Sequence, residues 1–150
     1  MIENDHDHDQ PRADLAAPGR EAVGHCLTWW RRKPAERYDA ATVRTMRITL
    51  SAIHMPAEDR WAAASAGDPA AAIGIAYRSK GHASWPFDTA MTALALAATA
   101  GNAAACLALA TVLRGIPGAG KAEARIAASW LASAFAAHRT DHRHHRGDDS

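Results

Sequence analysis

The chain has 150 residues, 48% of them hydrophobic and 22% charged, and its formal net charge is +1. The length fits one domain, and the near-neutral charge argues against a broad face for nucleic acid or anionic membrane. No uninterrupted apolar stretch approaches the roughly 18–20 residues that cross a bilayer. The start, MIENDHDHD, lacks the basic and apolar regions of a secretory signal. We therefore expect a cytoplasmic protein without a membrane span.

The expected chain order is a polar tail, one helical domain and a second polar tail. Residues 1–18 are acidic, contain histidine and proline and lack apolar periodicity, which predicts a disordered tail. Residues 19–138 show helical apolar spacing and no sustained β alternation, which predicts a single all-α domain. Residues 139–150 are expected to form a disordered, histidine-rich tail. The seven expected helices are Arg20–Arg32, Asp39–His54, Ala57–Ala66, Asp68–Ser79, Asp88–Ala100, Asn102–Arg114 and Ala122–Ala137.

One sequence block occurs twice within the expected helical domain. Residues 63–72 read AASAGDPAAA and residues 97–106 read AATAGNAAAC, with the two glycines 34 positions apart. Glycine takes the left-handed conformation that ends a helix, and the Asp or Asn that follows it is a preferred N-cap. Each block therefore predicts a helix, a tight turn and a second helix, and the period is typical of stacked helical repeats.

This pattern resembles the Sel1-like repeat family, a tetratricopeptide-like (TPR-like) class, over about residues 57–137. The matching positions are Ala90, Met91, Leu94, Ala97, Ala98, Gly101, Ala105, Leu109, Ala110, Leu113, Gly115, Ala127, Trp130 and Ala134. Ala93 departs from the pattern, because the family places a tryptophan there. The resemblance implies a short right-handed stack of antiparallel helix pairs. It also implies a non-enzymatic adaptor or regulator that contacts a protein partner.

Two aromatic clusters are candidates for that contact. The first is Trp29–Lys33, in which Trp30 fits the apolar face and Trp29 is expected to be exposed beside three cations. The second is the Lys80–Phe87 loop. Tryptophan and arginine are favoured binding anchors, although each aromatic residue can instead pack structurally against a neighbouring helix. The candidate partner-binding residues are Trp29, Arg31, Arg32, Tyr77, His82, Trp85 and Phe87.

Histidines alternate or crowd with aspartates near both ends of the chain. Imidazole binds Zn, Ni and Cu, so the alternative function is a small metal-binding protein that uses the two tails. Adventitious binding and no role at all are the other readings of such tracts. The candidate ligands are His6, His8, His142, His144 and His145.

Catalysis has little support in the sequence. The run Gly115–Lys121 matches the GxxxxGK of a phosphate-binding loop, but Ala122 replaces the Ser or Thr that holds magnesium. A helix rather than a strand is also expected before the run. No histidine has an evident nucleophile or carboxylate partner. The sequence therefore predicts that the protein is not an enzyme.

Overall fold

The computed structural model describes residues 24–79 and 85–144, with side chains as far as Thr140, and this part contains helices and no strand. The expected all-α fold is thus confirmed. Its elements are the 3₁₀-helices η1 (Trp29–Arg31) and η2 (Ala35–Arg37), followed by the α-helices α2 (Ala40–Ser51), α3 (Trp61–Ser65), α4 (Pro69–Ser79), α5 (Trp85–Thr99), α6 (Ala103–Arg114) and α7 (Lys121–His144).

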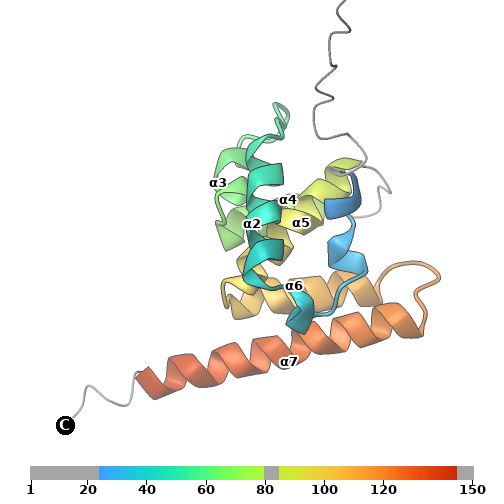
Figure 1. The fold of residues 1–150 in the computed structure, drawn as a ribbon, viewed down its shortest axis with the longest axis vertical. Helices are drawn as coiled ribbons and strands as arrows, with labels where there is room; N and C mark the ends of the chain where they lie inside the picture. Colours follow the sequence, from blue (N-terminus) through green and yellow to red (C-terminus); the bar gives the residue numbers. More distant parts are fainter. Residues whose placement is uncertain (1–23, 80–84, 145–150) are drawn as a thin grey trace, which may run out of the picture.

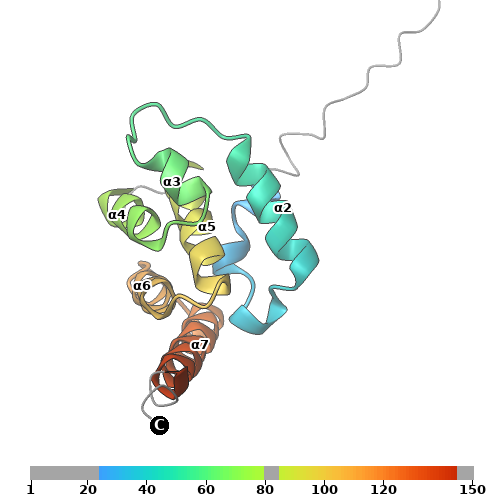
Figure 2. The same ribbon diagram turned by 90° about the vertical axis from the view of Figure 1, so that its left-hand side faces the viewer.

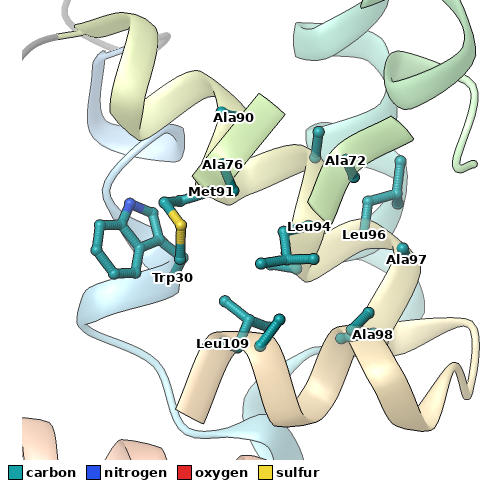
Figure 3. Packing of buried hydrophobic residues seen from close by; sticks show 14 of the residues in the cluster. Trp30, Ala72, Ala76, Ala90, Met91, Leu94, Leu96, Ala97, Ala98 and Leu109 are labelled. Atoms are coloured by element: carbon teal, nitrogen blue, oxygen red, sulfur yellow. The ribbon is translucent and has the colours of Figure 1, made fainter. Parts of the chain in front are cut away.

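Helix α5 lies at the centre of the fold, between α2 and α4 (Figure 2). Its residues are buried on every side of the helix: Phe87 is buried, and so is each residue from Thr89 to Ala98. A helix that is apolar all round is a core helix, and the many alanines allow its neighbours to approach closely. Figure 3 shows Leu94 of α5 near Leu109 of α6, with Met91 beside Trp30. The core therefore gathers around α5.

The two glycine joints have the predicted conformation. Gly67 and Gly101 have φ values of +103° and +90°. At the first joint, the Asp68 amide donates to the Ala63 carbonyl at 3.0 Å, and the Gly67 amide donates to the carbonyl of Ala64 at 3.0 Å. The second joint has the equivalent pair of bonds, which together define a Schellman motif.

The predicted capping residues then start the next helices. The Asp68 carboxylate accepts a hydrogen bond from the Ala71 amide at 2.9 Å, and the Asn102 side chain accepts one from the Ala105 amide at 2.8 Å. Helix α4 packs on α5, α6 packs on α7, and α5 contacts α6 between the two pairs.

Helix α7 is longer than the sequence predicted. Its amino end is capped by Glu123, whose carboxylate accepts from the Gly120 amide at 2.8 Å. The helix runs back along α6 and continues past it towards the carboxyl end (Figure 1). The expected helix end at Ala137 is wrong, because α7 continues to His144. No proline or glycine interrupts the sequence between 121 and 146.

The expected helix Arg20–Arg32 is also wrong within the described residues. Residues 24–26 are helical, a turn follows, and η1 completes the segment. The Thr28 hydroxyl bonds the His25 carbonyl at 3.0 Å, which favours a tight turn at this point.

Other helices also begin or end at residues different from those expected. The expected Asp39–His54 helix ends at Ser51, and only Trp61–Ser65 of the expected Ala57–Ala66 is helical. The Lys80–Phe87 segment is not wholly a loop, since α5 already begins at Trp85. Pro86 is tolerated there because the first turn of a helix needs no amide donor.

Candidate functional site

The candidate site forms at the corner where the chain passes from η1 through Pro34 to η2. Trp30 anchors this corner from the inside. It is 1% exposed, and its indole Nε1 donates to the Asp88 carboxylate of α5 at 3.0 Å. Arg31 pairs with the same carboxylate oxygen, and its guanidinium lies 4.7 Å from the Trp30 ring centre. One α5 carboxylate therefore fixes the side chains of both Trp30 and Arg31.

The second half of the corner is fixed against α7 and α2. The Ala35 amide donates to the Ser129 hydroxyl of α7 at 2.9 Å, and the Tyr38 ring packs on Trp130 with 5.3 Å between ring centres. Asp39 then caps α2 by accepting from the Thr42 amide at 2.7 Å. Hydrogen bonding with Thr42 lowers the pKa of the Asp39 carboxyl, which favours its ionised form.

A hollow of about 820 Å³ lies between this corner and the amino-terminal turns of α7. We call it the basic groove. Four cations and two carboxylates line it, which leaves a formal excess of two positive charges (4 − 2). Its lining residues are Arg32, Lys33, Pro34, Glu36, Arg37, Asp39, Thr42, Ala122, Arg125 and Ile126.

None of the four cations has an ion-pair partner within the described part of the chain. Ion pairs there join Arg31 to Asp88 and two other arginines to acids outside the groove, so the guanidinium groups of Arg32, Arg37 and Arg125 remain unpaired. The fourth cation, Lys33, lies 4.2 Å from the ring centre of Trp29. A guanidinium offers a planar fork of donors that matches a carboxylate. The groove is therefore suited to acidic groups.

The structure separates the predicted residues of the first aromatic cluster. Trp29 is half-buried between Lys33 and the ring of His25, whose centre lies 6.2 Å away. The Arg31 guanidinium forms an ion pair with the Asp88 carboxylate. Arg32 alone, of the three predicted contacts in this cluster, lines the basic groove.

The second aromatic cluster is divided as well. Tyr77 and Trp85 are 51% and 57% exposed, on α4 and at the start of α5. Phe87 is 8% exposed and packs edge-on against Trp30 at 5.7 Å, so the expectation that it is an accessible contact is wrong. His82 lies outside the described residues.

The predicted metal ligands are beyond what the structure describes. His6, His8 and His145 lie outside the described residues, and for His142 and His144 only the helical backbone is described. Among the described side chains, no group of three or more His, Cys, Asp or Glu residues is placed to hold a metal ion.

A smaller hollow of about 330 Å³ lies beside Tyr38, Cys106 and Trp130. The Tyr38 hydroxyl and the Trp130 indole Nε1 are buried there without a hydrogen-bond partner among the described residues. Burial raises the pKa of the Cys106 thiol. A thiol that stays protonated is a poor nucleophile, so burial disfavours attack by Cys106. Both cysteines are buried and free, as a structural role predicts.

Sequence reasoning missed Arg37 and Arg125 as site residues. Arg37 belongs to a 3₁₀-helix that follows a proline, and Arg125 lies almost ninety positions later (125 − 37) on α7. The visible signal was the excess of basic residues in 31–37, RRKPAER. Nothing in the local sequence shows that α7 closes the other side of the groove.

Comparison of the chain with models of known protein families, with curated proteins and with solved structures finds no match. Within the residues that the structure describes, no helix is long and apolar enough to cross a membrane.

Proposed function

We propose that this protein is a non-enzymatic interaction module, an adaptor or regulator that binds a protein partner through the basic groove. The observation that supports it is a set of three guanidinium groups, around one hollow of about 820 Å³, that form no ion pair with the residues described by the structure. Unpaired arginines at a shaped surface favour an acidic partner, because charge complementarity steers encounter and fixes register. The helix pairs α4/α5 and α6/α7, with their matched glycine joints, are compatible with a Sel1-like repeat scaffold.

The partner in this proposal is a protein with an acidic segment rather than a nucleic acid. Nucleic-acid binders neutralise many phosphates with a broad basic surface. The net charge of +1 and the two carboxylates inside the groove argue against such a surface. A peptide that carries carboxylates at a few positions suits the mixed lining better.

The corner supplies the rigidity that recognition requires. Arg32 and Arg37 flank a chain segment held by Trp30, Ala35 and Tyr38, so a ligand meets a shape that is already formed. Preorganised surfaces lose less conformational entropy on binding.

The test compares two charge-reversal variants of the full chain. Arg37→Glu with Arg125→Glu reverses two groove cations. The matched control, Arg44→Glu with Arg47→Glu, makes the same charge change on exposed positions of α2 outside the groove lining. Each protein is used to capture partners from lysate with and without nuclease treatment, and captured partners are titrated by calorimetry.

We expect the wild type and the control to bind the same partner, with affinity that falls as salt rises. The groove variant should lose at least about tenfold in affinity, since truncating or reversing interfacial charges costs on the order of 2 kcal/mol or more. Equal binding by both variants, or capture that disappears with nuclease, would contradict the proposal.

A further inference from the structure

The chain carries an acidic segment of its own in the part of the sequence before the first described residue. Residues 3–9 read ENDHDHD and contain four carboxylates, Glu3, Asp5, Asp7 and Asp9, with no lysine or arginine. The basic groove has a formal excess of two positive charges. We propose that residues 3–9 bind in the basic groove and compete with the partner for it. This inference rests on the proposed function of the groove and adds its regulation.

Three of the acids can lie on one side of the segment. In an extended chain, residues i, i+2 and i+4 share one side at intervals of about 6.5–7 Å. Asp5, Asp7 and Asp9 then form one row, and the histidines between them fall on the other side. The three carboxylates equal in number the guanidinium groups of Arg32, Arg37 and Arg125, each of which can donate two hydrogen bonds to one carboxylate.

The chain between the acidic segment and the described residues is long enough for the segment to reach the basic groove. Residues 10–23 separate the acidic segment from Gly24, the first described residue, and span up to about 50 Å when extended at roughly 3.3–3.6 Å per residue. Arg32 follows Gly24 by eight residues (32 − 24), so the same arithmetic places it within about 29 Å of Gly24. The connecting chain therefore exceeds the distance that it must cover to the first groove residue.

A weak contact is sufficient because it is intramolecular. A short linker gives an effective concentration in the millimolar range. A segment with an intrinsic dissociation constant of about 0.1–1 mM then occupies the groove for half of the time or more. Such occupancy lowers the apparent affinity for a partner by about two- to tenfold.

Zero-length cross-linking tests this contact directly on the full chain. A carbodiimide joins a carboxylate to a lysine amine as an amide with loss of water. The chain has three lysines, Lys33, Lys80 and Lys121, of which Lys33 lines the groove. At low ionic strength we expect amides between the Asp5–Asp9 segment and Lys33, mapped by mass spectrometry on the monomer fraction. Linkage to Lys80, the residue that follows the end of α4 at Ser79 in the sequence, serves as the internal reference.

Two controls separate docking from chance collision. The Lys33 cross-link should be lost in Arg37→Glu with Arg125→Glu and at high salt, and should persist in Arg44→Glu with Arg47→Glu. Absence of the Lys33 cross-link, equal linkage to Lys80, or equal yield in both variants would overturn the proposal.

A second measurement separates this inference from the proposed function. Asp5→Asn with Asp7→Asn and Asp9→Asn should raise partner affinity about two- to tenfold in the wild-type background and leave the groove variant unchanged. If a partner binds the groove and the triple substitution has no effect, the docking proposal alone fails. If the Lys33 cross-link forms and no partner binds the groove, the proposed function fails and the docking stands.

Discussion

The helices α4–α7 and the corner at residues 28–39 take their conformations from different sources. In α4–α7, glycines, caps and apolar spacing within each segment specify the helices, and the second joint repeats the chemistry of the first 34 residues later. At the corner, the chain is held by side chains far away in sequence, chiefly Asp88 and Ser129. The scaffold is therefore specified by local sequence, whereas the candidate site is specified by tertiary contacts.

The largest expected effect comes from the core around α5. Leu94→Ala removes a side chain that is 0% exposed and should lower the free energy of unfolding by about 2–5 kcal/mol, through lost burial and the cavity left behind. Leu107→Ala on α6, where the side chain is 46% exposed, should change it by only about 0.5 kcal/mol. Urea unfolding followed by circular dichroism measures both, and similar losses would mean that α5 is not the centre of the core.

A smaller loss of stability is expected when the corner is disrupted. Asp88→Ala leaves the Trp30 indole and the Arg31 guanidinium without their shared acceptor, and we expect a loss of about 1–3 kcal/mol. Glu58→Ala breaks the exposed pair with Arg78 at 2.7 Å and should lose at most about 1 kcal/mol. Hydrogen exchange should additionally show faster amides in residues 28–38 for Asp88→Ala alone. If exchange rises equally across α4–α7, the corner is not an independently held unit.

The two glycine joints provide a smaller and more symmetrical test. Gly67→Ala and Gly101→Ala each put a Cβ on a backbone with positive φ, although neither Cβ meets an atom within 4 Å. The loss should therefore come from conformation alone, at about 1–2 kcal/mol each. Equal shifts in the unfolding midpoint would support equivalent joints. A loss at one joint only would argue against a true repeat.

Particular residues show how far the sequence predicted this molecule. Gly67, Asp68, Gly101 and Asn102 act locally, so their roles and the helices beside them could be predicted. Trp30 was correctly expected in the core, but its hydrogen bond to Asp88 was not foreseen, because 58 residues separate the two.

The same limit applies to the candidate site. Arg32 was predicted as a contact, whereas Arg37 and Arg125 meet it only once α7 packs on η2. Phe87 was expected in a loop, yet helix α5 starts before it and buries it against Trp30. The sequence pattern within one segment does not predict which residues of a distant segment will lie beside it.

The smallest expected effect is a pH dependence at the boundary between the two regions. Asp39 lies at the end of the corner and caps α2, and the bonds to Thr42 lower the pKa of its carboxyl. A folded-state pKa below the unfolded value of about 3.9 means that the carboxylate stabilises the fold above that pH, and that this contribution disappears as the pH falls through the folded pKa. Asp39→Asn keeps a good cap and removes the titration.

The wild type should therefore lose more thermal stability than Asp39→Asn between pH 5 and pH 2, and the two should respond alike between pH 5 and pH 7. Differential scanning calorimetry across this range measures the difference. Asp39 is exposed, so solvent screens its charge and the gap should be smaller than any effect above. An equal acid response in both proteins would show that the carboxylate charge adds nothing to the cap, and that the corner joins α2 through hydrogen-bond geometry alone.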